Sequence, residues 1–373
     1  MKYFDFRGEK ISRLGFGLMR FPLLEDKSID KAQVAEMFKA AIEGGVNYFD
    51  TAWPYHDGQS ESIVKELLVA NYPRESFYLA DKFPGHQFFE TIRPEKVEEI
   101  FETQLAKCGV DYFDFYLLHN VCEISIDNYE SPVSRIIEYF EKQRELGRIK
   151  HLGFSSHALP DLLDKFLSDH EGAFEFCQLQ FNYLDWTLQD ADKKLEILTR
   201  HGVPMWVMEP LRGGKLAEDR ELAFRFIDSK DNVGVILSGM SSLEQMKQNI
   251  ETFSGDAAFS AEDEKYLLDK AETMKDAIPC TACGYCKAGC PMELDIPKLI
   301  AAYNDSKYAI SFAPSMFIEA LPDDKKPGAC LGCGACAQIC PQKIDIPEVM
   351  KKFSEMNLIS WKALCEEREK ARK

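Results

Sequence analysis

The sequence lacks the features that would place the protein in a membrane or outside the cell. No stretch of its 373 residues approaches the about 20 apolar residues that a membrane-spanning helix needs. The N-terminal stretch MKYFDFRGEKISRLGFG has no charged-then-apolar signal-peptide pattern. Hydrophobic residues make up 45% of the chain and charged residues 29%, which is typical of a soluble globular protein. We therefore expect a cytoplasmic protein.

Positive charge is scarce relative to negative charge. The chain has 45 Lys and Arg against 62 Asp and Glu, a formal net charge of −17 at pH 7. A surface of this sign repels a phosphate backbone, so we expect no nucleic-acid partner. We interpret the acidic surface as a source of solubility, with an acidic docking face as the alternative.

No apolar run ends in a G-x-G-x-x-G turn, which disfavours an open dinucleotide-binding sheet. Between residues 13 and 253 there are instead eight short apolar runs separated by amphipathic stretches. Continuous hydrophobicity is typical of strands buried on both faces. Eight strand–helix units in series predict a (β/α)8 TIM barrel, placed at residues 1–260. The runs are RLGFGLM, VNYFD, FYLADK, FDFYLLH, IKHLGFSS, FCQLQFN, VPMWVME and VGVILSG.

Two of the intervening stretches have clear helix boundaries. DKAQVAEMFKAAIEGG has apolar residues at three-to-four spacing and a stop at Gly44. RPEKVEEIFETQLAKCG begins near Pro94 and stops at Gly109. Both are predicted to be helices of the barrel's outer layer.

Polar residues close several of the apolar runs. Asp50, Lys82, His119 and the pair Ser155–Ser156 each stand at the end of one, and Tyr55 follows Asp50 by five residues. Barrel enzymes place their chemistry at the C-terminal ends of the strands. These residues are therefore the candidates for an active site.

The segments around these residues resemble the aldo-keto reductase superfamily. The resemblance covers roughly residues 11–253, and seven matching segments occur in the family's order. They are FDTAWPYHDGQSE (49–61), LADKFP (79–84), YLLHN (116–120), GRIKHLGFSSH (147–157), QLQFN (178–182), EPLRGGKL (209–216) and SGMSSLEQMKQNI (238–250).

The resemblance implies a catalytic tetrad of Asp50, Tyr55, Lys82 and His119. Tyr55 would protonate a carbonyl oxygen as hydride arrives from NADPH or NADH. Lys82 would lower the pKa of Tyr55 from its usual value of about 10, and Asp50 would hold Lys82 in place. His119 would orient the carbonyl. The structural alternatives are a buried ion pair, a surface tyrosine and a core histidine.

The same resemblance implies the cofactor and substrate contacts. NADP-preferring members often carry Lys and Arg at the positions of Gly239 and Gln245, so NADPH and NADH both stay open. Met208 stands where many relatives place a tyrosine against the nicotinamide. The implied cofactor contacts are Gly17, Ser155, Ser156, Gln178, Met208, Pro210, Leu211, Gly213, Gly239, Ser241, Gln245 and Asn249. The implied substrate contacts are Trp53, Phe83 and Asn120, with packing as their alternative role.

The chain has twelve cysteines, which in a cytoplasmic protein disfavours a disulfide framework. Eight of them form two copies of C-x2-C-x2-C-x3-C-P, offset by fifty residues (330 − 280). This spacing is the bacterial ferredoxin pattern for a [4Fe–4S] cluster, and a zinc site is the alternative. Because the fourth cysteine crosses over in two-cluster ferredoxins, we expect one cluster on Cys280, Cys283, Cys286 and Cys340, and the other on Cys330, Cys333, Cys336 and Cys290. We assign no role to Cys108, Cys122, Cys177 or Cys365.

Residues 261–373 are predicted to form a small, mainly α-helical ferredoxin-like domain. The segments SAEDEKYLLDKAETMKDA, IPKLIAAYN and IPEVMKKFSEM have helical patterns, and the alternative is a compact β-hairpin ferredoxin. Gly284 and Gly334 are expected to let backbone N–H groups approach the inorganic sulfides.

The whole chain therefore resembles aldo-keto reductases with a C-terminal ferredoxin domain. We expect an NAD(P)-dependent oxidoreductase that interconverts a carbonyl and an alcohol, with two [4Fe–4S] clusters that exchange electrons with a redox protein partner. Hydride carries two electrons and a cluster carries one, and no motif marks a flavin to convert between them. The alternatives are an NAD(P)-binding redox sensor or electron-transfer module, and a simple carbonyl reductase with structural clusters.

Overall fold

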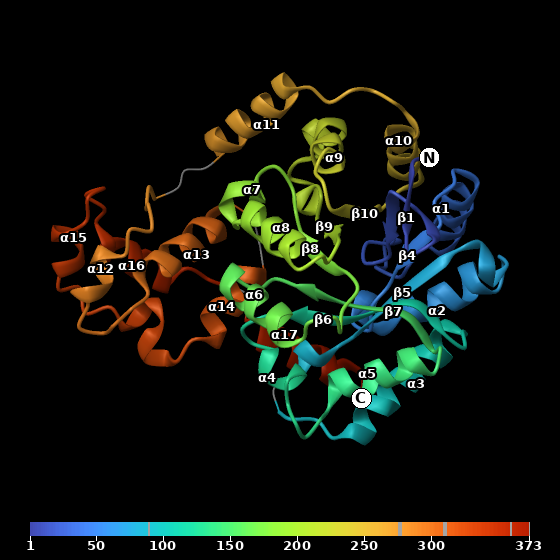
Figure 1. Cartoon of the computed structure of the whole chain (residues 1–373), viewed down its shortest axis with the longest axis horizontal. Coiled ribbons are helices and arrows are strands. Elements are labelled where there is room, and N and C mark those ends of the chain that lie inside the picture. The colour runs from blue at the N-terminus through green and yellow to red at the C-terminus, as the bar shows by residue number, and fades with distance from the viewer. Residues whose placement is uncertain (89, 275–277, 309–311, 359, 373) are drawn as a thin grey trace.

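Eight parallel strands close into a barrel in the order β10-β3-β4-β5-β6-β7-β8-β9 (Figure 1). The computed structural model describes residues 1–88, 90–274, 278–308, 312–358 and 360–372. Each predicted apolar run contains one strand, so the predicted barrel is confirmed. The strands are β3 (Leu14–Gly17), β4 (Tyr48–Asp50), β5 (Tyr78–Phe83), β6 (Phe113–Val121), β7 (Ile149–Ser156), β8 (Cys177–Gln180), β9 (Met205–Met208) and β10 (Val233–Gly239).

The register of the barrel brings the ends of the strands together. Gly17 pairs with Asp50 and Asp50 with Ala80, while Lys82 pairs with Leu117. Side chains alternate between the barrel interior and the surrounding helices along each strand. The interior side chains nearest the C-terminal ends therefore form one layer at the barrel mouth.

Helices surround the barrel, and both boundary predictions are confirmed. In α1 (Lys31–Glu43) the Asp30 side chain accepts from Gln33 N at 3.0 Å, and Gly44 follows the last residue. In α3 (Pro94–Cys108) the next residue, Gly109, is left-handed with φ of 69°. The other outer helices are α2 (Ser60–Ile63), α4 (Ile126–Tyr129), α5 (Ile136–Glu145), α6 (Pro160–Asp169), α7 (Asp185–Leu188), α8 (Ala191–Arg200), α9 (Arg220–Asp228) and α10 (Leu243–Ser254).

A hairpin that the sequence did not predict closes the N-terminal end of the barrel. Strands β1 (Tyr3–Phe6) and β2 (Glu9–Ser12) pair antiparallel. Phe6 packs against Trp206 of the barrel interior, with ring centroids 5.0 Å apart. The bottom of the barrel is therefore filled by apolar side chains, and only the opposite end is available for chemistry.

The helix α11 (Ala261–Met274) lies where a second domain was predicted to begin. Its buried residues Leu267 and Ala271 join the apolar core of the barrel. Lys270 forms an ion pair with Asp219, 2.6 Å apart, next to α9. The division at residue 260 stays a prediction.

The described residues after 277 form a helical lobe beside the barrel (Figure 1). Its described residues contain helices and turns but no strand, as the α-helical ferredoxin type predicts. Helices begin at Tyr285 and Ala335, and again at Ile296 and Ile346, each pair fifty residues apart, so the sequence duplication is also a structural one. The helices are α12 (Tyr285–Ala288), α13 (Ile296–Tyr308), α14 (Phe312–Ala320), α15 (Ala335–Gln338), α16 (Ile346–Glu355) and α17 (Trp361–Arg372).

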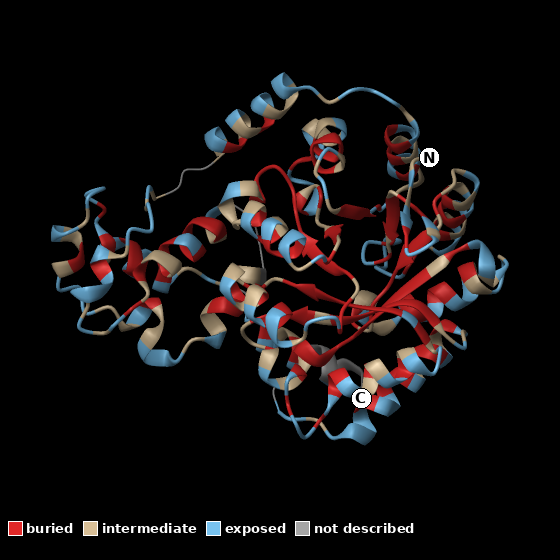
Figure 2. Cartoon of the chain, viewed as in Figure 1, coloured by how far each residue is buried: buried red, intermediate tan, exposed pale blue. Residues whose placement is uncertain are grey.

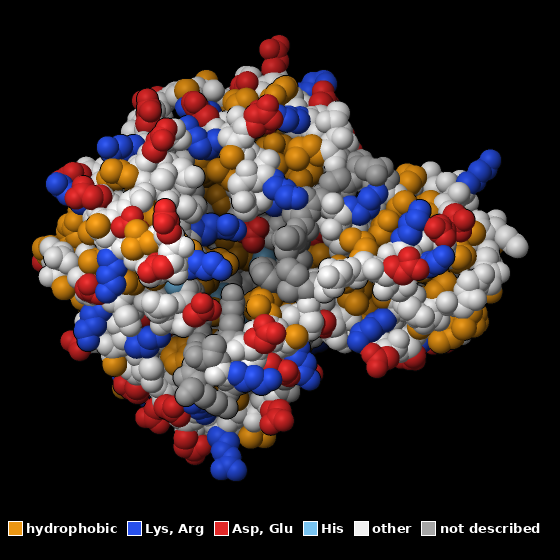
Figure 3. All heavy atoms as spheres, turned by 180° about the vertical axis from the view of Figure 1, so that it is seen from behind, with side chains coloured by type: hydrophobic (Ala, Val, Ile, Leu, Met, Phe, Trp, Pro, Cys, Tyr) orange, Lys and Arg blue, Asp and Glu red, His pale blue; other side chains and the backbone are white. Residues whose placement is uncertain are grey.

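The buried residues form a large apolar core in the barrel and a smaller, separate one in the helical lobe (Figure 2). Acidic and basic side chains are intermixed over the face seen in Figure 3. No helix within the described ranges is long and apolar enough to cross a membrane.

The last helices of the helical lobe return to the barrel. Met316 of α14 and Trp361 and Cys365 of α17 are buried in one cluster with Cys122 and Ala158, which follow β6 and β7. Part of the helical lobe therefore covers the C-terminal end of the barrel.

Candidate active site and cluster sites

Three of the predicted tetrad residues meet at one ammonium group. Lys82 Nζ lies 2.5 Å from Asp50 Oδ1 and 3.3 Å from Tyr55 Oη, and it donates to Thr51 O at 2.7 Å. The Lys82 side chain is fully buried. A buried cation with a carboxylate on one side and a phenol on the other favours the phenolate when the phenol loses its proton.

The loop that carries Tyr55 is held in a strained form. His56 and Asp57 have φ of 51° and 54°, in the left-handed region. The His56 ring stacks on Phe21, and its Nε2 accepts from Phe21 N at 3.0 Å. These contacts hold Tyr55 against the end of β5.

The fourth tetrad residue, His119, faces Tyr55 with ring centroids 6.0 Å apart. Its ring also contacts His86, with centroids 4.4 Å apart. Burial lowers the pKa of His119 well below its usual value, and His86 and Lys82 add to the effect. His119 is therefore neutral at pH 7 and has one N–H to donate.

The pKa of Tyr55 differs from the expectation. Lys82 does act to lower it, but burial of the phenol has the larger effect, and the pKa of Tyr55 is raised. Burial likewise raises the pKa of Asp50 against the opposing effect of Lys82. Burial acts to lower the pKa of Lys82, but the neighbouring Asp50 has the opposite effect, and the pKa of Lys82 is raised overall. Tyr55 is therefore protonated at pH 7.

Two further buried polar residues, Asp81 and Gln104, hydrogen-bond the backbone of Lys82, and the sequence analysis missed both. Asp81 Oδ1 accepts from Lys82 N at 2.8 Å, and Gln104 Nε2 donates to Lys82 O at 3.0 Å. Burial and the nearby Glu61 raise the pKa of Asp81 well above its usual value. Glu61 is itself paired with Lys107. The only sequence signal was the acidic residue inside the apolar run FYLADK.

Of the predicted nicotinamide contacts, Gln178 and Ser155 lie in the same layer as the tetrad, whereas Ser156 neighbours Ser155 on β7 and points to the opposite face. Gln178 Nε2 donates to Asp50 Oδ2 at 3.2 Å. Ser155 Oγ accepts from Asn120 N at 2.8 Å, and Ser156 Oγ donates to Val121 O at 2.7 Å. Gly17, Met208 and Gly239 end β3, β9 and β10, which places them at the same mouth.

The predicted adenosine contacts follow β10. The Gln245 side chain accepts from Ser241 N at 2.8 Å, and Asn249 Nδ2 donates to Ser238 Oγ at 3.1 Å. Asn249 Oδ1 accepts from Arg220 at 3.1 Å. Gln245 and Asn249 are therefore held in two separate hydrogen-bonded groups along α10.

Arg20 lies beside the predicted cofactor contacts, and the sequence analysis missed it. A Cβ on Gly239 would stand 3.1 Å from Arg20 Cδ, and a Cβ on Gly213 would stand 3.5 Å from Arg20 Nη2. The exposed Arg20 side chain therefore fills the space of a side chain at position 239 and brings a positive charge close to both Gly239 and Gly213. Its signal was its position directly after the first apolar run.

The PLRGG segment forms a tight turn after β9. Pro210 and Leu211 lead into a 3-10 turn at Arg212–Gly214, in which Gly213 has φ of 67°. A glycine is required there because the left-handed conformation disfavours a side chain. The Arg212 guanidinium points into the protein, where it is about 1% exposed, and binds Asp185 and Asp305. It is therefore not available to a ligand.

The predicted substrate contacts do not all meet. Trp53 is half-buried, with Lys107 Nζ 5.0 Å from its ring centroid. Phe83 does not join the site, because it neighbours Lys82 along β5 and so points to the opposite face, where it packs on Phe140 of α5. Asn120 is buried, and its Nδ2 lies 2.9 Å from Met316 Sδ of α14. The helical lobe thus forms part of the site's wall.

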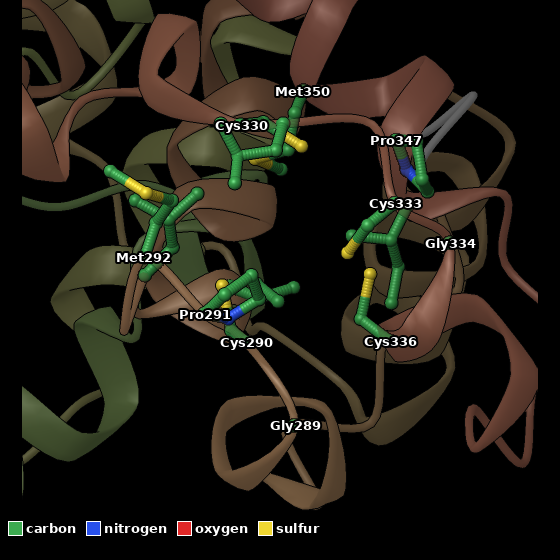
Figure 4. Close-up of a pocket in the computed structure, with 14 residues that line it drawn as sticks. Gly289, Cys290, Pro291, Met292, Cys330, Cys333, Gly334, Cys336, Pro347 and Met350 are labelled. Atoms are coloured by element: carbon green, nitrogen blue, oxygen red, sulfur yellow. The ribbon is translucent and has the colours of Figure 1, made fainter.

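The eight motif cysteines line two separate hollows in the predicted crossed arrangement. Cys280, Cys283, Cys286 and Cys340 line one hollow. Cys290, Cys330, Cys333 and Cys336 lie around the other (Figure 4). Gly284 and Gly334 are left-handed with φ of 77° and 74° at the start of α12 and α15, and the approach of their backbone N–H groups to the sulfides stays a prediction.

The hollows fit a cluster of several atoms better than a single ion. Among the described residues, no three His, Cys, Asp or Glu side chains converge closely enough to hold one metal ion. A tetrahedral zinc site needs four ligands about 2.3 Å from one centre. Four soft thiolates spread around a hollow instead suit a [4Fe–4S] cube.

The fold and the site together define a TIM-barrel oxidoreductase. The chain belongs to the aldo/keto reductase family, whose sequence pattern matches residues 13–221. The pattern of a 4Fe-4S dicluster domain matches residues 279–344. The predicted fold, a barrel followed by a helical ferredoxin-like domain, is therefore confirmed.

Individual relatives match the barrel. A probable aldo-keto reductase 1 of Glycine max is 28% identical over 214 residues, 56% of this chain and 58% of that protein. An NADH-specific methylglyoxal reductase of Escherichia coli is 25% identical over 202 residues, 50% of this chain and 59% of that protein. The chain thus spans less than two thirds of either. The solved holo form of a Bacillus halodurans aldo-keto reductase superposes with a TM-score of 0.58 at 24% identity, over 71% of this chain and 93% of that one.

Proposed function

We propose that the barrel interconverts a carbonyl and an alcohol by hydride transfer with NADPH or NADH. The observation that carries this proposal is the placement of Lys82 Nζ between Asp50 and Tyr55 at the barrel mouth. A family resemblance over the same residues supports it. The substrate is a small carbonyl compound or its alcohol.

Each tetrad residue has a distinct role in this reaction. A bound nicotinamide would supply or accept the hydride. Tyr55, protonated at pH 7, gives its proton to the carbonyl oxygen. Lys82 stabilises the phenolate that remains, and Asp50 holds Lys82. Neutral His119 donates to the same oxygen and orients it.

The cofactor would bind along the C-terminal ends of β7 to β10. Ser155 and Gln178 would hold the carboxamide beside Met208. Gly213, Gly214 and the backbone of the PLRGG turn would face the pyrophosphate, with Arg20 as its cation. Position 239 carries no basic side chain, so we propose that Arg20 supplies the charge for phosphate and that NADH and NADPH both bind.

We also propose that the helical lobe holds two [4Fe–4S] clusters with the crossed ligands. Clusters transfer single electrons, so they would exchange electrons with a separate redox protein. Exposed Leu331 and Tyr285, 67% and 63% accessible beside the motif cysteines, support docking of such a protein there. The domains would be residues 1–260 and 261–373.

The test is anaerobic and uses the cluster-loaded chain. Tyr55→Phe removes the proton donor, and we expect it to abolish carbonyl reduction while NAD(P)H binding and the EPR signal of reduced clusters remain. Wild-type protein that binds NAD(P)H and titrates its clusters but reduces no carbonyl would favour the sensor alternative. Cluster-ligand variants that keep full carbonyl reductase activity would favour structural clusters.

A further inference from the structure

The two lobes are joined by a buried charged group at the candidate cofactor site. Arg212 Nη2 lies 2.6 Å from Asp305 Oδ1, and Arg212 Nη1 lies 2.6 Å from Asp185 Oδ1. Arg212 belongs to the PLRGG turn of the barrel, whereas Asp305 belongs to α13 of the helical lobe. The side chains of Arg212 and Asp305 are 1% and 8% exposed. The charges are therefore shielded from water and hold each other strongly.

Both acceptors of Arg212 are themselves held in place. Gln180 Nε2 donates to Asp185 Oδ2 at 2.8 Å, and Gln189 Nε2 donates to Asp305 Oδ2 at 2.8 Å. Hydrogen bonds of this kind fix the carboxylates, and the guanidinium, which binds one oxygen of each, then has one orientation. The network therefore fixes the position of Arg212 and of the turn that carries it.

The turn needs such an anchor because its backbone is strained. Glu209 and Arg212 have φ of 51° and 45°, which side-chain-bearing residues adopt at a cost. The adjacent Gly213 and Gly214 are exposed to the cleft. Without the anchor, the turn would relax to other conformations, and its N–H groups would no longer be preorganised for an anion.

The same helix also lines a cluster site. Pro297 and Ile300 of α13 lie against the hollow of Cys280, Cys283, Cys286 and Cys340. Asn304 Oδ1 accepts from Ile278 N at 2.8 Å, which fixes the chain just before Cys280. Asp305 follows Ile300 by five residues, about 7.5 Å along a helix. One short rigid helix therefore connects this cluster site to the PLRGG turn.

We propose that Asp305, a residue of the helical lobe, is a positioning residue of the barrel's cofactor site. It acts through Arg212 to keep the PLRGG turn in the conformation that binds the cofactor's pyrophosphate. Because α13 also lines the neighbouring cluster site, the position of Asp305 depends on that cluster. This inference rests on the proposed function, since it takes the PLRGG turn to bind a nicotinamide nucleotide.

The first measurement is the Kd of NADH and NADPH for cluster-loaded full-length protein, followed anaerobically by fluorescence titration. Asp305→Asn keeps the size of the side chain but removes its charge. We expect it to raise the Kd of both nucleotides about fivefold or more, the usual scale of coupling between linked sites. Asp161→Asn is the matched control, because it breaks the exposed ion pair of Asp161 with Lys298 of the same helix. That variant is expected to bind like wild type, since exposed pairs contribute little.

A double-mutant cycle tests whether Asp305 acts through Arg212. In an Arg212→Met background, Asp305→Asn is expected to change the Kd no further. The cycle also remains informative if Asp305→Asn alone folds poorly, because the double variant removes Asp305 and Arg212 together, and the remaining carboxylate of Asp185 still accepts hydrogen bonds from Gln180 and Asn182. Cluster absorption and circular dichroism check that each variant is folded and loaded.

The reciprocal measurement follows the cluster. By linkage, a nucleotide that binds the loaded protein more tightly must also stabilise the cluster. We expect saturating NADH or NADPH to slow cluster loss to a chelator severalfold in wild type and in Asp161→Asn, but not in Asp305→Asn. Equal nucleotide Kd values in wild type and Asp305→Asn would overturn the inference and leave the proposed function intact. Wild-type protein that binds neither nucleotide would overturn the proposed function itself.

Discussion

The indole of Trp361 stacks on the imidazole of His86, with ring centroids 5.4 Å apart and ring planes at 29°. Trp361 begins the last helix, α17, whereas His86 follows β5 of the barrel. Because His86 also contacts His119, the C-terminal helix lies one ring away from the candidate catalytic histidine. The helical lobe therefore supports the proposed active site as well as the cofactor turn.

Trp361→Ala is expected to lower kcat for carbonyl reduction by roughly tenfold, the effect of a small misplacement near the reacting groups. The missing indole leaves a cavity into which His86 can turn, and His119 then loses its fixed orientation. Trp361→Phe keeps a ring in place and should retain most of the activity. Lys370→Ala, an exposed position on the same helix, is the control. Steady-state kinetics that show unchanged kcat in Trp361→Ala would contradict this role.

The crossed cluster ligation is testable from a variant with one cluster removed. Cys280→Ala with Cys283→Ala should lower the iron content from about eight to about four per chain. Adding Cys340→Ala should then change nothing, because Cys340 serves the cluster already lost. Adding Cys290→Ala should alter the EPR spectrum of the remaining cluster. The opposite result for the two additions would show that each motif binds its own cluster.

Arg20→Ala is expected to weaken binding of NADH and NADPH by a similar factor, on the order of tenfold, because a charge-assisted contact to phosphate is lost. The wild-type Kd should also rise more steeply with salt than that of the variant. Titrations at two ionic strengths measure both effects. A loss confined to NADPH would instead place Arg20 at the 2′-phosphate, and an unchanged Kd would exclude it from the cofactor site.

Stability should fall as the pH is lowered through the range in which half-buried His157 resists protonation. Burial lowers the pKa of His157 to about 4, whereas an unfolded histidine titrates near 6.5. Between these values the unfolded chain binds more protons, so the free energy of unfolding decreases from pH 6.5 to pH 4. His157 contributes at most about 3 kcal/mol to this decrease. Anaerobic urea unfolding of His157→Gln at pH 7.5 and pH 5 should show a smaller decrease than wild type.

Much of the barrel was predictable because strands buried on both faces must be apolar throughout. Their polar ends then mark one edge, and the structure brings Asp50, Lys82 and His119 together there. Phe83 was predicted to contact the substrate because it lies next to Lys82 in the sequence. Side chains alternate along a strand, however, so Phe83 points away from Lys82 and packs outside the site. The neighbours of Arg20 could not be predicted, because its contact with Gly239 and Gly213 depends on closure of the barrel between β10 and β3.

The sequence by itself determined the parts of this protein: the strands and their polar ends, and two cysteine motifs whose spacing and duplication are local properties of the chain. Only the tertiary structure decided how these parts meet. Asn120 and Met316 are 196 residues apart, and Arg212 and Asp305 are 93 apart. Contacts over such separations depend on how whole elements pack, which no local pattern encodes. The pairing of the two lobes through Asp305 and Trp361 is therefore a property of the folded chain alone.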